Sequence, residues 1–262
     1  MKFKQRSLNL TGRILLGLIL LTSLASLVTF AQDRASTGSD YIIFVSARTG
    51  NSELFAMNLN DLSVSQLTNT GRSHITPFVA TGAQVATFAS REGSSYEIFS
   101  ADVSASWRSN RPMFATVNRL TVNTIEETNP TLTTDGSKMS FSANGAITMM
   151  DSSGDNRREV VPADGFLNVA PSISPDGKFI AFLSNRDGAN EVWTVNTATS
   201  ELKQITHGGA VIGGISWTPD EKRIVFTTTA TTSKLTGIAM ADVASGSVTV
   251  LTESGDGEAA VS

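Results

Sequence analysis

A repeat with a period of 41 to 53 residues constrains the fold of this chain more than any other feature of its sequence. A phenylalanine in a short alternating apolar segment recurs at Phe44, Phe88, Phe141, Phe182 and Phe226, with spacings of 44, 53, 41 and 44 residues. The most regular copy, residues 171–206, contains four such segments joined by turns rich in Asp, Asn and Gly. Four strands in each period of this length predict an all-β fold, a β-propeller of four-stranded blades.

The same copy carries a recognisable motif. Ser-Pro-Asp-Gly-Lys at 174–178 is followed by Ile-Ala-Phe, an Arg-x-Gly turn, an acid before an aliphatic-aromatic pair, and a closing Ile-Thr. This pattern resembles the WD40-like repeat of the TolB-type β-propellers, and the resemblance covers residues 41–262. In the third copy, Asn144-Gly145 predicts a two-residue hairpin. In the fifth, Glu221 stands where the turn glycine belongs, which predicts a different local turn.

The two ends of the repeat region predict how the ring closes. The first copy begins at its second strand, residues 41–46, and Ala259–Ser262 lie one 44-residue period beyond residues 215–218. The last residues therefore have first-strand register. We expect five blades closed by the C-terminal strand joining the N-terminal blade, in a monomer. The alternative is a truncated six-bladed product.

The N-terminal residues indicate export. A basic segment precedes an apolar run from Ile14 to Phe30, and Thr29-Phe30-Ala31 offers small residues at the positions that a signal peptidase reads. We predict a signal peptide over 1–31, cleaved after Ala31, then a polar spacer over 32–40 and the propeller over 41–262. The protein would be periplasmic or secreted, without a membrane span after cleavage. An uncleaved N-terminal anchor is the alternative, because the apolar run is at the lower limit for a bilayer span.

Composition excludes several classes of protein. The chain has no cysteine, so it can form neither disulfides nor thiolate metal sites, and its net charge of -4 argues against nucleic-acid binding. Its two histidines, His74 and His207, lack neighbouring ligands, and residues 151–156 fit a turn better than a calcium loop. We predict no cofactor, metal or catalytic residue. Arg–Glu pairs that flank three hairpins predict cross-strand ion pairs at Arg48–Glu53, Arg91–Glu97 and Arg186–Glu191.

An insertion in the second copy is the first candidate for partner binding. Phe99 to Leu120 spans 21 residues, whereas the equivalent spans Phe55 to Leu67 and Trp193 to Ile205 are 12 residues. The insertion has the composition of a protein-binding hot spot, with candidate contacts Trp107, Arg108, Arg111 and Phe114. The alternative is a loop whose aromatic side chains fold back on the blade.

The loops that lead into each innermost strand are the second candidate. The resemblance implies that they converge around the central channel, where family members commonly bind partners or ligands. Their candidate binding residues are His74, Glu127, Asn129, Asn168 and Glu258. The sequence thus predicts a non-enzymatic binding or scaffolding module with a protein partner in the cell envelope. The alternatives are a glycosidase or lyase with Glu127 and Glu258 in the channel, or the propeller remnant of a peptidase-associated protein.

Overall fold

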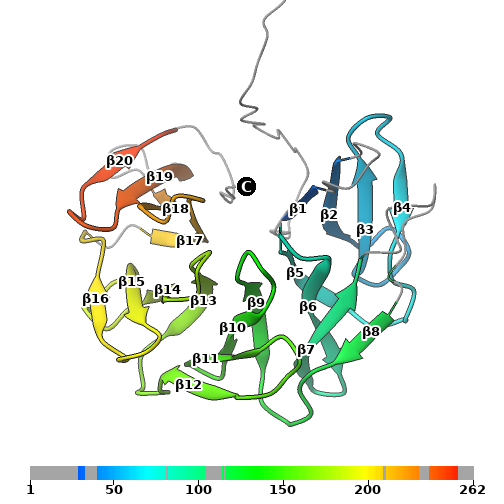
Figure 1. Ribbon diagram of the computed structural model, residues 1–262, viewed down its shortest axis with the longest axis horizontal. Helices are drawn as coiled ribbons and strands as arrows, with labels where there is room; N and C mark the ends of the chain where they lie inside the picture. Colours follow the sequence, from blue (N-terminus) through cyan, green and yellow to red (C-terminus); the bar gives the residue numbers. More distant parts are fainter. Residues whose placement is uncertain are drawn as a thin grey trace, which may run out of the picture.

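The described part of the chain forms five antiparallel sheets. The computed structural model describes residues 29–32, 40–80, 82–103, 114, 116–208, 211–229 and 236–252. They fold into twenty strands in five four-stranded sheets, which we number blades 1 to 5 in chain order. The blades follow one another around a central axis (Figure 1). The predicted all-β, five-bladed propeller is confirmed.

Within each blade the strands follow chain order from the inner to the outer edge, and neighbouring strands pair antiparallel. Their bounds, from blade 1 to blade 5, are β1 (Thr29–Gln32), β2 (Asp40–Ser46), β3 (Glu53–Asn58), β4 (Val64–Gln66); β5 (His74–Val79), β6 (Val85–Glu92), β7 (Ser95–Asp102), β8 (Thr116–Arg119); β9 (Glu127–Leu132), β10 (Lys138–Ala143), β11 (Ala146–Asp151), β12 (Arg158–Val161); β13 (Asn168–Ile173), β14 (Phe179–Ser184), β15 (Glu191–Asn196), β16 (Leu202–Gln204); β17 (Val211–Trp217), β18 (Arg223–Thr229), β19 (Thr236–Asp242), β20 (Val248–Val250).

The inner strand of blade 1 differs from the prediction. The position expected for Ala259–Ser262 is taken by β1, whose Ala31 pairs with Tyr41 of β2. A segment only a few residues before β2 loses little chain entropy on pairing with it, which favours this local partner. Residues 259–262 lie outside the described residues. The predicted cleavage after Ala31 falls inside β1, so the boundaries of signal peptide, spacer and propeller stay predictions.

Two turn predictions have opposite outcomes. The two-residue hairpin of blade 3 is confirmed, since Ala143 pairs with Ala146 and both turn residues have positive φ. The prediction of a different turn at Glu221 is wrong. Glu221 has φ +60° and its N–H donates to Thr218 O at 2.9 Å, as the N–H of Gly177 donates to Ser174 O in blade 4. The flanking strands therefore impose the left-handed conformation on a residue with a Cβ, at an energetic cost.

The hydrophobic core lies between the blades. The second-strand phenylalanines of blades 2 to 5, Phe88, Phe141, Phe182 and Phe226, are at most 2% exposed, and each belongs to a cluster with residues of the preceding blade. Burial of these rings stabilises each junction. Within the ranges given above, no helix is long and apolar enough to cross a membrane.

Candidate functional site

Three of the predicted channel residues begin the innermost strands β5, β9 and β13. His74, Glu127 and Asn168 occupy equivalent places there, paired with Ser90, Ala143 and Ser184. All three are buried, and each contacts the preceding blade or the chain that leads from it. We call these contacts interblade clasps. The structure places the three residues in three separate clasps, not together in one site.

The clasp between blades 1 and 2 joins His74 to Glu53, the first residue of β3. His74 Nε2 lies 3.3 Å from Glu53 Oε2 and 2.8 Å from Thr70 Oγ1. The other carboxylate oxygen, Oε1, accepts the backbone N–H groups of Thr70 and Gly71, each at 3.0 Å. A buried carboxylate thus holds the loop that leads into the next blade.

Burial lowers the pKa of His74, although the negative charge of Glu53 opposes this shift. The physical reason is visible at the second ring nitrogen, Nδ1, which is buried and has no hydrogen-bond partner. A protonated imidazole would bury a second N–H donor there without an acceptor. His74 is therefore neutral near pH 7 and serves as a packing and hydrogen-bonding residue of the clasp.

The clasp between blades 2 and 3 contains two fully buried carboxylates, Glu97 and Glu127. Asn123 bridges them: its backbone N–H donates to Glu97 Oε1 at 2.9 Å, and its side-chain amide donates to Glu127 Oε1 at 3.0 Å. Arg157 lies 2.6 Å from Glu127 Oε1, and Arg119 lies 3.5 Å from Glu97 Oε1. The charge of each acid is matched by an arginine, so Glu127 is an ion-paired structural residue.

Asn168 forms the clasp between blades 3 and 4. Its amide donates to Gly145 O at 2.9 Å and to Asp164 Oδ1 at 3.0 Å, and its oxygen accepts from Ser184 Oγ and from Arg186. Its hydrogen-bonding capacity is therefore used within the protein.

Asn129 lies inside β9 and has φ +56°. Its N–H donates to Thr76 Oγ1 of β5 at 3.2 Å, which links blades 2 and 3 a second time. Its side chain is partly exposed, so it is the predicted inner-strand residue that the described structure leaves closest to solvent. Glu258, the fifth residue of this set, lies outside the described residues.

Four of the five repeats close on a threonine, and the third has Val161 at this place. Thr68 Oγ1 donates to Glu53 Oε2 at 2.5 Å and accepts Leu54 N–H at 2.9 Å. Thr206 makes the same two bonds, to Glu191 Oε2 at 2.5 Å and from Val192 N–H at 2.9 Å. In the sequence, this bond is indicated by an acid that recurs at the start of the third strand together with a threonine that recurs at the end of the repeat.

The predicted Arg48–Glu53 and Arg91–Glu97 ion pairs are wrong. The guanidinium of Arg48 lies 4.6 Å from the centroid of Phe55, and that of Arg91 lies 5.2 Å from that of Tyr96. The glutamate of each pair is buried in an interblade clasp, whereas the arginine lies over an aromatic ring and does not reach the glutamate. Arg186, the third predicted partner, also lies over rings and is ion-paired with Asp164 at 3.4 Å.

The insertion of blade 2 is described only in part. Phe114 is 8% exposed and stacks on Phe88, with ring centroids 5.9 Å apart, in the core between blades 1 and 2. This residue thus follows the alternative interpretation, in which an aromatic side chain of the insertion folds back on the blade. Trp107, Arg108 and Arg111 lie outside the described residues.

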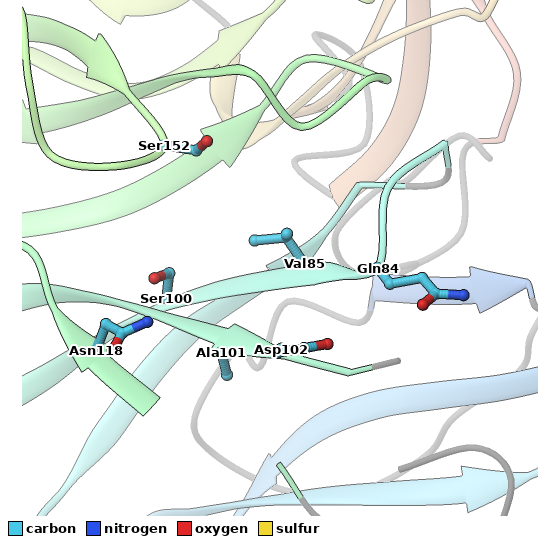
Figure 2. A pocket seen from close by; sticks show the side chains of 7 residues that line it. All are labelled: Gln84, Val85, Ser100, Ala101, Asp102, Asn118 and Ser152. Carbon is cyan, nitrogen blue, oxygen red and sulfur yellow. The ribbon is translucent and has the colours of Figure 1, made fainter. Parts of the chain in front are cut away.

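An open cleft of about 450 Å³ lies between blades 2 and 3 (Figure 2). Its lining combines two apolar side chains with hydroxyl, amide and carboxylate groups, from Gln84, Val85, Ser100, Ala101, Asp102, Asn118 and Ser152. β7 ends at Asp102 and β8 begins at Thr116, so the insertion leaves and re-enters the blade at the cleft. A comparable cleft between blades 4 and 5 is crossed by Lys203, whose Nζ donates to Val243 O at 2.6 Å. Asn118 stands at the position of Lys203.

Known proteins share this architecture. The family model described as PD40, TolB beta propeller domain, matches residues 143–262. A protein TolB homolog of Chlorobium luteolum is 25% identical over 194 residues, which cover 68% of this chain and 39% of that protein. The chain therefore spans about two fifths of the length of this curated relative.

Solved structures agree on the fold. TolB from Acinetobacter baumannii superposes with a TM-score of 0.66 at 21% identity, over 81% of this chain and 52% of that one. A putative TolB from Agrobacterium tumefaciens superposes with 0.64 at 18% identity, over 82% and 77%. An oligogalacturonate lyase reaches 0.51 at 14% identity, over 88% and 85%. At these identities the likeness shows the fold alone, and it includes both TolB proteins and an enzyme.

Proposed function

We propose that this chain, whose repeats and fold are similar to those of TolB-type β-propellers, is an exported, non-enzymatic binding module that holds a protein partner in the cell envelope. One observation carries this proposal. The inner-strand residues that suggested catalysis or ligand binding, His74, Glu127 and Asn168, are buried in interblade clasps, so their polar groups stabilise the ring. The groups that are available to bind a partner then lie on the exposed surfaces of the protein.

The N-terminal sequence supports export. Its basic residues, apolar run and small residues before Gln32 have the order of a signal peptide. Cleavage after Ala31 would remove three of the four residues of β1. N-terminal sequencing of the protein recovered from the periplasm tests this step, and an intact N-terminus would favour the anchor instead.

The surface that we assign to the partner is the cleft between blades 2 and 3, together with the insertion that begins and ends beside it. The cleft offers hydrogen-bonding groups around Val85 and Ala101, which suits an extended polar segment of polypeptide. Arg108 and Arg111 favour acidic residues in that segment, and Trp107 supplies an aromatic anchor.

The test is capture of a partner from envelope extract, followed by affinity measurement with that partner. Replacing Trp107, Arg108 and Arg111 together by Ala should weaken binding by about 2 kcal/mol or more without lowering the melting temperature. Asn118→Trp, which would fill the cleft, should also weaken it. Val122→Ala, at a residue that is 77% exposed in the segment between β8 and β9, is the control. Unchanged affinity in both site variants would refute the assignment of the partner to this surface.

The enzymatic alternative has a direct test. Glu127 lies in an ion pair with Arg157 and is fully buried, so we expect no hydrolysis or elimination on polysaccharides and no peptide hydrolysis. A measurable activity that Glu127→Gln abolishes would overturn the proposal of a non-enzymatic module.

A further inference from the structure

Two of the junctions between blades are crossed by a basic side chain of the outermost strand. Arg158 of β12 donates from its guanidinium group to Thr197 O of blade 4. Lys203 of β16 donates from Nζ to Val243 O of blade 5 at 2.6 Å, and to Ala244 O at 3.2 Å. In both junctions a cation of one blade thus binds a backbone oxygen of the next blade.

The sheet register shows that these two contacts are equivalent. Both basic residues pair with the third residue from the end of the third strand of their own blade. Their acceptors Thr197 and Val243 are each the first residue after the third strand of the next blade. At the junction of blades 2 and 3 these two places belong to Asn118, which pairs with Ser100, and to Ser152, which follows β11. An uncharged, shorter side chain therefore stands where the other two junctions have a cation.

The junction between blades 1 and 2 also has an uncharged residue at this place, but apolar packing closes it. Ser65 stands at the place of Asn118, and Val103 stands at the place of Ser152. Val103 is 2% exposed and belongs to one apolar cluster with Phe114. Ser152, in contrast, is partly exposed and lines the open cleft. The junction between blades 2 and 3 therefore has neither the cation nor the apolar residue at these places.

The lining of the cleft suits the side chain of a lysine or an arginine. Figure 2 shows Ser152 on one side of the cleft and Val85 on the other. Val85 and Ala101 offer apolar contact to the methylene groups of such a side chain. Asp102 adds a carboxylate to the lining, which favours a positive charge. Such a cleft can hold a cation without being filled by it, since the cleft between blades 4 and 5 measures about 640 Å³ with Lys203 across it.

We propose that the partner polypeptide inserts one lysine or arginine side chain between blades 2 and 3, with its charged end on the backbone oxygen of Ser152. The inserted side chain takes the place that Arg158 and Lys203 occupy at the next two junctions. Because it names the residue of the partner that enters the cleft, this proposal rests on the proposed function. Acidic residues elsewhere in the partner segment are compatible with it.

The first experiment measures binding of short peptides to the full chain by nuclear magnetic resonance. Four acetylated and amidated Gly-Ser octapeptides carry one central Lys, Arg, Gln or Glu. The Lys and Arg peptides should shift the backbone amide signals of Ser100, Asp102 and Ser152. They should bind at least about tenfold more tightly than the Gln peptide, since a charged donor forms the stronger hydrogen bond. Equal binding of the Lys and Gln peptides would overturn the proposal, and so would preferential binding of the Glu peptide.

Variants of the full chain test the position of the inserted side chain. Asn118→Lys supplies the missing cation from the chain itself: its ammonium group should bind Ser152 O as Lys203 binds Val243 O. It should therefore weaken binding of the Lys peptide at least about tenfold. Asn118→Gln lengthens the side chain without a charge and should leave this affinity nearly unchanged. Val248→Lys, at an exposed residue of β20 in blade 5, adds the same charge away from the cleft and is the matched control.

Both replaced residues are exposed, so these variants should fold like the unmodified chain. Unchanged binding of the Lys peptide by Asn118→Lys would overturn the proposal. Equal weakening by Asn118→Lys and Val248→Lys would show an effect of net charge and would also overturn it.

Capture of the partner from envelope extract separates this proposal from the proposed function. We expect Asn118→Lys to weaken capture, as the triple alanine variant of the insertion should. If the triple variant weakens capture and Asn118→Lys does not, the proposed function stands and the inserted basic side chain is wrong. Binding of the Lys peptide that Asn118→Lys abolishes, in a protein that captures no envelope partner, would support the basic-side-chain site and overturn the proposed function alone.

Discussion

The bond between the closing threonine and the buried glutamate gives a quantitative test of how the blades are held together. Replacing Thr68 by Val keeps the shape of the side chain but removes its hydroxyl. The buried Leu54 N–H then loses its side-chain acceptor, and the buried Glu53 loses a donor at 2.5 Å. A hydrogen bond to a charged group contributes about 1.5–3 kcal/mol, and an unsatisfied buried group costs about 1–3 kcal/mol. Since Glu53 keeps two backbone donors, we expect Thr68→Val to lower the free energy of unfolding by about 3 kcal/mol.

Blade 5 supplies the matched control. Thr252 Oγ1 accepts Ile238 N–H at 3.1 Å, but Gly237 stands where blades 1 and 4 have a glutamate. Thr252→Val therefore removes the backbone bond without disturbing a carboxylate, at a cost of about 1 kcal/mol. Urea unfolding and calorimetry should separate the two variants by about 2 kcal/mol, or roughly 4–8 °C in melting temperature. Equal losses would refute the assignment of a stabilising role to the carboxylate.

Three further predictions follow from single residues. Glu221→Gly should raise the free energy of unfolding by about 1 kcal/mol, because glycine adopts the left-handed conformation without the strain that a Cβ causes. Gly177→Ala should lower the free energy of unfolding for the same reason, and equal effects of the two variants in calorimetry would contradict this. The pKa of His74 is lowered in the folded state, so the unfolded chain takes up the proton first. The free energy of unfolding should therefore fall as pH decreases from about 7.5 to about 5.5, and His74→Gln should remove that part of the slope. Phe114→Ala should cost about 3 kcal/mol of stability, by urea unfolding, and leave partner affinity unchanged.

The features that sequence predicted best are those decided within a few residues. The Asp-Gly turns are an example: Asp176 Oδ1 accepts Lys178 N–H at 3.0 Å and Ser174 Oγ at 2.8 Å. Burial would raise the pKa of Asp176, but the hydrogen bonds and charge of Lys178 outweigh it and lower this pKa to about 2. Because such bonds join neighbouring residues, composition and spacing alone indicate the hairpins, and hence the blades.

The features that sequence did not predict depend on contacts between distant residues. His74 and Glu53 are 21 positions apart and meet only when two blades pack. Phe114 resembles an exposed hot-spot residue until the fold brings it onto Phe88. At the N-terminus, the apolar character of β1 also fits the end of a signal peptide, so the strand was not recognised. For His74 and Phe114 the residue type was noticed, but the partner lies too far along the chain for a local pattern to indicate it.

The clasps suggest how a polar residue at the start of an inner strand should be interpreted in this chain. Such a residue is close in sequence to the loops around the channel, which makes it a natural candidate for ligand binding. Here the preceding blade offers it a partner: Glu53 for His74, and the backbone oxygen of Gly145 for Asn168. Blade 5 begins with Val211, which packs in the apolar cluster between blades 4 and 5 and needs no such partner. The side chains of His74, Glu127 and Asn168 each have at least one polar partner within the protein, although His74 Nδ1 and Glu127 Oε2 are buried without one.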